Sequence, residues 1–457
     1  MSKLVIRTIE GKDGLPVAFP TGILLGAATN NIGVPGGQGF GVGICPALPA
    51  GMTQMAGTTD PAADNYGNYT FSDGSVMAWI PAFFYKYGTG ANGFAVNVVD
   101  IKPAAYFTSV AGANSAGYAL HRAFYDAGLV QTGFFIDKYL PSLNGAIASS
   151  LKNGAALSSA VRGSLASAHF SHCTGNSQTP ADAYYGAVAV AKSRGNNFFP
   201  ASMFQRAALA LLALAHGQAS TSTAWCAWWV ASGVSAPRGC NNNALGDYND
   251  AAILYTTDGN GTYAGCGQTG SANYFSRTTH NGQACGVADL NGLLWEISPG
   301  LTVASDVAKF YILKTTAQMK AMTSGTGGGV DLWGTEAQLL AAGYEELGAT
   351  YGALAASSSA KLFGAAAQVF GESVVSTPGA TGLVWQATGA GIPLVGGVGG
   401  TNPFGNDYFL DYRPGDMCPI SGGYWGYSSS AGVWALHLDN VRGASYYGVG
   451  FRAALYL

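Results

Sequence analysis

Hydrophobic and polar positions divide the first part of the chain into strand-like and turn-like segments. Residues 76–87 are dominated by apolar side chains and predict the first strong strand. A glycine-rich stretch at residues 88–93 follows, and residues 94–99 are again strand-like. Because no helix opens after these glycines, the stretch predicts a hairpin turn rather than a dinucleotide-binding loop.

Helical patterns are predicted over residues 115–127, 146–167, 181–194, 202–216 and 336–347. In the fourth of these ranges apolar side chains run almost all round the helix, which predicts a buried helix. Trp225, Trp228 and Trp229 follow this helix closely, and we expect them in the core or as a floor beneath the C-terminal loops.

The first 60 residues differ from the rest of the chain. Residues 3–8 alternate weakly between polar and apolar side chains, and Gly and Pro dominate from there to about residue 60. Such a segment is too short to bury a core of its own. We therefore expect residues 1–60 to form an extended β arm for attachment or oligomerisation, followed by a boundary loop rich in Ala, Asp and Asn.

The last forty residues interleave two kinds of position. Gly422-Gly423 and residues 433–436 and 450–455 have the character of scaffold. Between them lie large or polar-tipped side chains of the types that binding surfaces use, because rigid aromatics give contact area at a small entropic cost. We predict that the following residues bind a ligand: Tyr424, Trp425, Tyr427, Ser428, His437, Asp439, Asn440, Arg442, Ser445, Tyr446 and Tyr447. The alternative is that these aromatics pack a glycine-rich sheet.

The composition restricts the partners of the chain. Only 10% of the 457 residues are charged, against about a quarter in typical proteins, and 67 are Gly. Ser, Thr, Asn and Tyr surfaces must therefore keep the chain in solution, and an oligomer is expected to cover part of them.

The net charge of −3 gives no electrostatic reason to expect nucleic-acid binding. No apolar run is long enough to predict membrane insertion, and the start has no signal-peptide pattern, so we expect synthesis in a host cytoplasm.

Seven cysteines are scattered without Cys-x-x-Cys spacing, and this odd number argues against a disulfide framework. We expect most of them to be small buried side chains. Two pairs stay open as disulfides, Cys226 with Cys240 and Cys266 with Cys285.

Metal-binding residue types occur in two places. Asx side chains cluster at residues 241–250 and could ligate Ca²⁺, but the EF-hand spacing is absent and such clusters commonly form their own turns. His169, His172 and Cys173 lack a second ligand pair at zinc-finger spacing. We therefore expect no cofactor, with Ca²⁺ at the Asx cluster as the alternative.

Six segments resemble, in order, the motifs of the formylglycine-generating-enzyme-like branch of the C-type lectin fold. The first three are residues 77–85, residues 133–139 with an Asp-Lys-Tyr signature at their end, and residues 198–208. The last three are residues 291–297 with a Trp-Glu element, residues 421–425 with Gly-Gly-x-Trp, and residues 450–454 with the terminal Gly-Phe-Arg. Within this branch the chain is most similar to phage tail receptor-binding proteins and the variable proteins of diversity-generating retroelements.

The resemblance implies an α+β, C-type-lectin-like domain over residues 61–457, with an insertion at about 310–405. It implies a receptor-binding protein of a phage tail tip or tail fibre, which contacts a bacterial surface protein or glycan through C-terminal loops. By analogy with tail fibres, a homotrimer located in the virion tail is expected, joined to other virion proteins through the N-terminal arm.

Two other functions are compatible with the same scaffold. One is a structural virion protein, such as a capsid decoration. The other is a formylglycine-generating-type oxidase, but those enzymes place a reactive cysteine pair near the Gly-Gly motif, where this chain has Cys418 alone. Motifs for a nucleophile elbow or a zinc protease are absent from the sequence, so we predict that the chain is not an enzyme.

Overall fold

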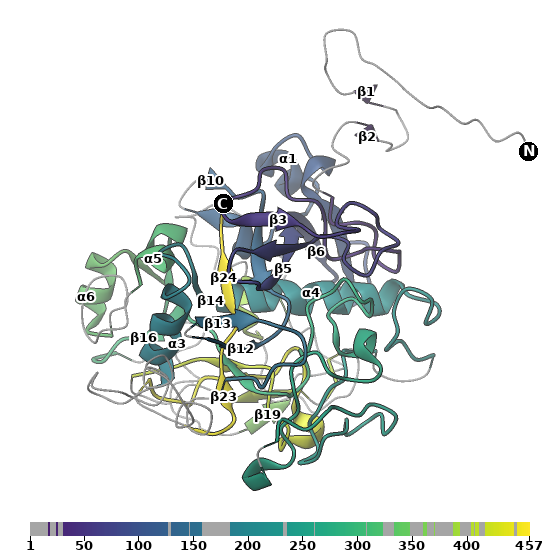
Figure 1. Ribbon diagram of the computed structural model, residues 1–457. Coiled ribbons are helices and arrows are strands. Elements are labelled where there is room, and N and C mark those ends of the chain that lie inside the picture. Colours follow the sequence, from purple (N-terminus) through teal and green to yellow (C-terminus); the bar gives the residue numbers. More distant parts are fainter. Residues whose placement is uncertain are drawn as a thin grey trace, which may run out of the picture.

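The protein combines short helices with strands arranged in several sheets, which confirms the mixed α and β class (Figure 1). The computed structural model describes residues 17–18, 24–25, 31–126, 129–145, 147–157, 183–231, 235–259, 261–307, 309–322, 333–347, 360–362, 370, 387–393, 404–405, 407–410, 416–442 and 446–457.

A six-stranded antiparallel sheet lies at the centre of the described fold. Its strands in spatial order are β14 (Phe199–Pro200), β24 (Ala453–Leu455), β11 (Gly133–Asp137), β5 (Val76–Pro81), β4 (Asn68–Phe71) and β3 (Met52–Gln54). β11 pairs with β5 on one side and with β24 on the other, so Phe135 lies opposite both Trp79 and Leu455. The first strong strand predicted from the sequence, β5, is therefore separated from the last strand of the chain, β24, by β11 alone.

A second six-stranded sheet is built mainly from the C-terminal third of the chain. Its order is β19 (Ala360–Leu362), β20 (Tyr408–Leu410), β22 (Leu436–His437), β21 (Ile420–Ser421), β15 (Trp295–Ile297) and β23 (Val449–Gly450). Two three-stranded sheets have the orders β16 (Leu301–Val303), β17 (Phe310–Leu313), β18 (Tyr344–Glu346) and β7 (Val99–Pro103), β6 (Phe83–Tyr87), β8 (Ala119–Leu120). Two-stranded ribbons pair β1 (Val17–Ala18) with β2 (Leu24–Leu25), β9 (Tyr125–Asp126) with β10 (Leu129–Val130), and β12 (Pro141–Asn144) with β13 (Ile147–Ser150).

The predicted buried helix is α4 (Met203–Ala219), which crosses the middle of the molecule in Figure 1. Ser202 caps it: the Ser202 hydroxyl accepts a hydrogen bond from the Gln205 backbone N–H, and the Gln205 side chain accepts one from the Ser202 backbone N–H. This reciprocal capping box fixes where the helix begins. All residues from 203 to 217 are buried, as the apolar pattern predicts.

Other helices are shorter than the patterns suggest. α3 (Ala183–Lys192) confirms the range 181–194, and α6 (Glu336–Ala341) confirms only the first half of 336–347, because the chain then enters β18. α1 (Val110–Ser115) and α5 (Thr316–Ala321) are further short helices. Figure 1 shows α5 and α6 together at one side of the molecule.

Two helix predictions are wrong. Residues 115–127 contain β8, a 3-10 turn (Arg122–Phe124) and β9, because β8 pairs with β6. The range 146–167 contains β13 instead of a helix, and its part beyond residue 157 lies outside the described residues.

The predicted strand 76–87 is two strands in different sheets. The break falls at Ala82, whose N–H donates to the Thr132 carbonyl (2.9 Å) while its carbonyl accepts from Ala104 (3.2 Å). The antiparallel pairing of β6 with β7 confirms the hairpin around residues 88–93, although the second strand begins only at Val99.

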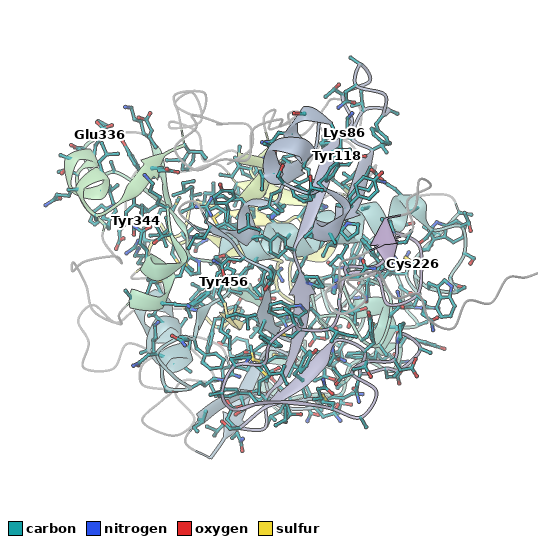
Figure 2. All side chains as sticks on the ribbon, turned by 90° about the horizontal axis from the view of Figure 1, so that it is seen from above. Lys86, Tyr118, Cys226, Glu336, Tyr344 and Tyr456 are labelled. Carbon is teal, nitrogen blue, oxygen red and sulfur yellow. The ribbon has the colours of Figure 1, made fainter. Side chains whose placement is uncertain are left out.

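The buried apolar cluster reaches from Ile32 to Tyr456 and includes Phe40 and Val42 from the range predicted as an arm. Figure 2 places Tyr456 inside the molecule and Glu336 at its edge. Trp295 and Phe451 are each 2% exposed, so both belong to the core.

Candidate functional site

Strand β15 brings the C-terminal loops together. Its neighbour β21 runs antiparallel to it, with Glu296 opposite Ser421, and its other neighbour β23 runs parallel, with Trp295 opposite Val449. The residues that follow β21 and those that precede β23 therefore leave the sheet at the same end of β15, beside Trp295. The Trp295 N–H donates to the Gly448 carbonyl (2.8 Å), which fixes the second loop to this end.

At this end five tyrosines, here called the tyrosine face, pack against one another: Tyr263, Tyr424, Tyr427, Tyr446 and Tyr447. The Tyr446 and Tyr447 rings are 4.1 Å apart between centroids, and the Tyr446 hydroxyl donates to the Tyr447 oxygen at 2.6 Å. Tyr447 stacks on Tyr263 at 4.6 Å. Tyr446 is 38% exposed and the other four rings are half-buried. The face therefore presents partly exposed tyrosine side chains on an aromatic base.

Trp425 lies beneath this face, not on it. It is only 3% exposed and contacts Tyr424 at 5.2 Å and Tyr447 at 5.8 Å between ring centroids. Its carbonyl accepts a hydrogen bond from Asn243, and a Cβ added to Gly265 would lie 2.2 Å from its ring. Trp425, which was predicted as a ligand-binding residue, is therefore not on the exposed surface, because it packs in one cluster with Cys240, Ile253, Tyr255 and Cys266.

His437 is also buried, at 5% exposed. Its ring lies 4.2 Å from that of Trp295, and its Nε2 is 3.1 Å from the Tyr427 hydroxyl. Burial lowers the pKa of His437 to about 3, so the imidazole is neutral at pH 7. The 3.6 Å approach of its Nδ1 to Asp439 is therefore not an ion pair at that pH.

Arg442 is 2% exposed and acts inside the fold. Its Nε lies 3.2 Å from Asp416 in an ion pair without hydrogen-bond geometry, and its guanidinium stacks over the Tyr184 ring at 4.4 Å. A buried, paired and stacked guanidinium holds segments of the chain together, so Arg442 is not part of the exposed surface.

The other predicted residues reach the surface at least in part. Ser428 is half-buried and has a positive φ of 56°, where it begins a 3-10 turn (Ser428–Ser430). Asp439 and Asn440 are half-buried and share a 3.2 Å hydrogen bond from the Asn440 amide. Ser445 lies outside the described residues.

Sequence reasoning missed Tyr263, which comes from the polar loop before β15 and is the last residue of a 3-10 turn (Gly261–Tyr263). An aromatic residue within a run of Gly, Thr and Asn was the available signal. Without Tyr263, the set of residues predicted from the sequence lacks one of the five rings of the tyrosine face.

The chemistry of the face is neutral. Burial raises the pKa of the Tyr424, Tyr427 and Tyr446 hydroxyls, so they stay protonated and both donate and accept hydrogen bonds. Among the predicted residues that reach the surface and are described, Asp439 is the one charged side chain. Such a face suits stacking and hydrogen bonding.

The Asx cluster satisfies its own turns. Asp247 accepts hydrogen bonds from the backbone of Gly239 (2.8 Å) and Asn249 (2.9 Å), and Asn241 accepts one from Tyr248 (2.8 Å). The described residues hold no group of three or more His, Cys, Asp or Glu side chains placed to bind a metal. Calcium binding stays a prediction, and His169, His172 and Cys173 lie outside the described residues.

The cysteines open to pairing are not bridged: Cys226, Cys240 and Cys285 carry free thiols, so neither proposed disulfide forms. Among the described helices, none has both the length and the apolar character needed to cross a membrane.

The described fold and face define a mixed α and β protein with a neutral aromatic surface at the end of one sheet. No family model matches the chain, and no curated protein matches it. Its structural neighbours are Major Tropism Determinant variants. The U1 variant aligns with a TM-score of 0.30 at 13% identity, and the P3c variant with 0.29 at 14%; each alignment covers 90% of this chain and 73% of the other. These names agree with the resemblance found in the sequence, but at such TM-scores the likeness carries no argument about function.

Proposed function

We propose that the chain is a receptor-binding protein of a phage tail tip or tail fibre, and that the tyrosine face contacts a molecule on the bacterial surface. The observation that carries this proposal is the face itself: five tyrosines in mutual contact, partly exposed and uncharged. Tyrosine provides large, amphipathic contact area with little loss of side-chain entropy, which is why recognition surfaces use it.

The support beneath the face favours recognition rather than simple packing. Trp295, Trp425 and His437 are buried and hold the rings from below, so the outer side chains can vary without removing the core. Rigid scaffolds that carry exchangeable loop residues are the usual architecture of binding proteins.

The more specific parts of this proposal, on fold family, attachment, oligomeric state and location, rest on the sequence resemblance. They are a C-type-lectin-like fold of the formylglycine-generating-enzyme-like branch, attachment to other virion proteins through residues 1–60, a homotrimer, and a place in the virion tail. Several copies on one particle multiply a weak contact through effective concentration. The protein is proposed to bind without catalysing a reaction.

Two alternative functions would require different structural properties of the chain. A structural virion protein would cover the tyrosine face with neighbouring subunits. An oxidase would need a reactive thiol, but Cys418 is only 4% exposed, whereas reactive cysteines are accessible. The burial of Cys418 disfavours the oxidase, and the exposure of the tyrosine face in the assembled particle distinguishes receptor binding from a structural role.

The test measures binding of the purified, fluorescently labelled chain to a panel of bacterial strains, alongside its melting temperature. Tyr446→Ala and Tyr424→Ala should each weaken binding by about 2 kcal/mol, or roughly thirtyfold in Kd, with little change in melting. The matched control is Tyr248→Ala, a tyrosine that is 52% exposed and outside the face. Binding that survives both face variants, or failure of the chain to bind any strain, would overturn the proposal.

A further inference from the structure

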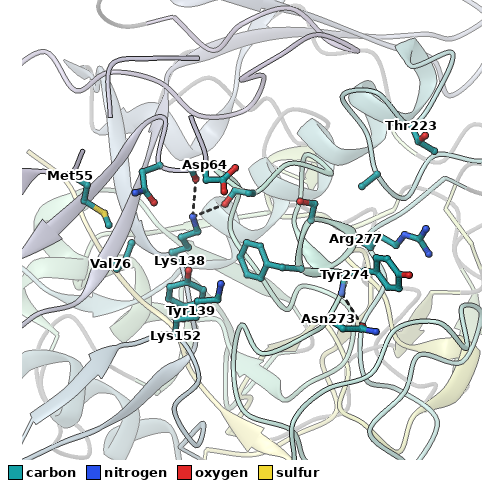
Figure 3. A pocket seen from close by; sticks show the side chains of 15 residues that line it. Met55, Asp64, Val76, Lys138, Tyr139, Lys152, Thr223, Asn273, Tyr274 and Arg277 are labelled. Atoms are coloured by element: carbon teal, nitrogen blue, oxygen red, sulfur yellow. Dashed lines mark hydrogen bonds between the residues drawn. The ribbon is translucent and has the colours of Figure 1, made fainter. Parts of the chain in front are cut away.

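A cavity of about 900 Å³ opens among residues that do not belong to the tyrosine face (Figure 3). Its walls come from the turn after β11, the turn after β13, the segment after α4, and residues 273–277. Its volume falls within the range of roughly 300–1,000 Å³ typical of small-molecule sites.

The cavity gathers positive charge in a chain that has little charge of any kind. Lys138, Lys152 and Arg277 line it, against one carboxylate, Asp64. Arg277 is paired with Asp250 at 2.6 Å. Lys152 is exposed and lies over the Phe275 ring at 4.9 Å, and it forms no ion pair with any residue that the structure describes. Its charge is therefore available to a ligand.

Lys138 adds a buried charge whose direct hydrogen-bond partners are neutral. It is 2% exposed, and its ammonium donates to the Ala284 carbonyl (2.6 Å), the Asp64 carbonyl (3.5 Å) and the Asn68 amide oxygen, all of which are neutral acceptors. Burial lowers the pKa of Lys138 to about 8. The like charge of Lys152 acts in the same direction, while Cys285 and the Asp64 carboxylate act against it. An anion in the cavity would offset this unfavourable burial.

Aromatic rings lie beside each of the outer cations. The Arg277 guanidinium stacks over the Tyr274 ring at 4.6 Å, as Lys152 does over Phe275. Figure 3 shows Lys138 and Lys152 with Tyr139 on one side of the cavity and Tyr274 with Arg277 on the other. Tyr274 is 49% exposed, so the part of its side chain that Arg277 does not cover is open to a flat or ring-shaped ligand.

The cavity continues into a second hollow of about 240 Å³. The two share Asp64, Thr223 and Ser276, and the second hollow reaches Trp225, which is 43% exposed. Together they form a groove with a charged end and a further aromatic side chain along it. This shape suits a linear ligand of several rings better than a lone ion.

We propose that this groove binds an acidic saccharide, with a sugar ring on Tyr274 or Phe275 and its carboxylate directed to Lys152. Carboxylates form their strongest hydrogen bonds with cationic donors, and the negative face of an aromatic ring attracts the polarised C–H groups of a sugar. The site stands independently of the tyrosine face, since the two share no residue.

The test measures binding of D-glucuronate to the full chain by ligand-detected NMR titration, with D-glucose and inorganic phosphate as separate probes. Glucuronate should bind saturably and more tightly than either glucose or phosphate. Lys152→Met should weaken glucuronate binding by about tenfold, the loss of one charge-assisted contact. Tyr274→Ala should weaken both glucuronate and glucose. Lys314→Met is the control, because Lys314 is an exposed lysine (43% of its side chain) outside the groove.

Phosphate binding as tight as that of glucuronate would mean that the ring contributes nothing, and the saccharide assignment would be wrong. Equal affinity in wild-type and Lys152→Met chains, or no saturable binding of glucuronate, would overturn the site itself. Melting temperatures of the two variants separate lost binding from lost folding, which is not expected at exposed side chains.

Discussion

Arg452 and Glu296 form a buried ion pair that ties the end of the chain to β15. Arg452 Nε lies 3.1 Å from Glu296 Oε2, and the two side chains are 0% and 2% exposed. Arg452 also donates to the carbonyls of Asp137 (2.8 Å) and Lys138 (2.9 Å), while Glu296 accepts from Arg206 of α4 at 3.2 Å. One guanidinium thus joins both six-stranded sheets.

The first prediction concerns this pair. Arg452→Met removes the cation that pairs with Glu296 and its hydrogen bonds to backbone carbonyls, and it should reduce the free energy of unfolding by roughly 3–5 kcal/mol, as for other broken buried pairs. Denaturant unfolding would measure the change. Lys309→Met is the control, because it breaks the exposed ion pair with Glu336 and should leave stability almost unchanged. If both variants lowered the free energy of unfolding by the same amount, the buried pair would contribute no more to stability than the exposed pair.

The second prediction concerns the support of the tyrosine face. Trp295→Ala should cost roughly 3–5 kcal/mol, since a large buried ring is lost. The same change removes the ring that contacts Tyr427 at 5.0 Å and His437 at 4.2 Å, so the face should loosen as well. Thermal unfolding followed by near-ultraviolet circular dichroism reports both effects. An unchanged melting temperature would contradict the core placement of Trp295.

Local sequence signals predicted the elements that depend on local forces. α4 has both an apolar circumference and a capping box at Ser202, and each is visible in the sequence. The helix predicted over residues 115–127 is wrong because Ala119 and Leu120 form a strand through pairing with β6, for example Leu120 with Phe84. Such pairing depends on a partner distant in the sequence, and residue propensity does not contain it.

The candidate site was predictable by residue type but not by orientation. Four of the five tyrosines in the face were chosen from the C-terminal segment. The burial of Trp425 could not be foreseen, because it depends on the loop at residues 240–266 that closes over its ring. The contribution of Tyr263 depends on the same long-range contact.

The third prediction follows from that contact. Gly265→Ala should displace Trp425, because the added Cβ would lie 2.2 Å from the ring and 3.0 Å from the Ala244 nitrogen. Overpacking of this kind costs about 1–3 kcal/mol. Tryptophan fluorescence and binding to bacterial cells should both change. Gly261→Ala is the control, since a Cβ there meets nothing within 4 Å; a change of the same size in both variants would argue against Trp425 as the support.

The fourth prediction concerns acid stability and rests on His280. The Val287 N–H donates to His280 Nδ1 (3.1 Å), so the ring carries its proton on Nε2, which lies 3.1 Å from the Gly41 carbonyl. His216 repeats the arrangement, with Gly36 donating to Nδ1 (3.0 Å) and Nε2 2.7 Å from the Trp225 carbonyl. These two neutral rings hold residues 36–41 against the core. A second proton on either ring would sit on Nδ1, where it would point at the backbone N–H that now donates to that atom, and this hydrogen bond would be lost.

Burial lowers the pKa of His280 to about 3 and that of His216 to about 4, against 6.5 for an unperturbed histidine. Between those values and 6.5 the unfolded chain binds more protons than the folded one, so stability falls as the pH falls through this window, by about 1.4 kcal/mol per pH unit for each ring. Asp407, whose pKa burial raises to about 7, acts in the opposite direction between about 4 and 7.

A comparison with a variant isolates the histidine contribution. His280→Gln should be less stable than the wild type at pH 7, and its unfolding free energy between pH 6 and 4 should have a slope smaller by about 1.4 kcal/mol per unit. Parallel pH profiles of wild type and variant would show that His280 is not the buried neutral ring described.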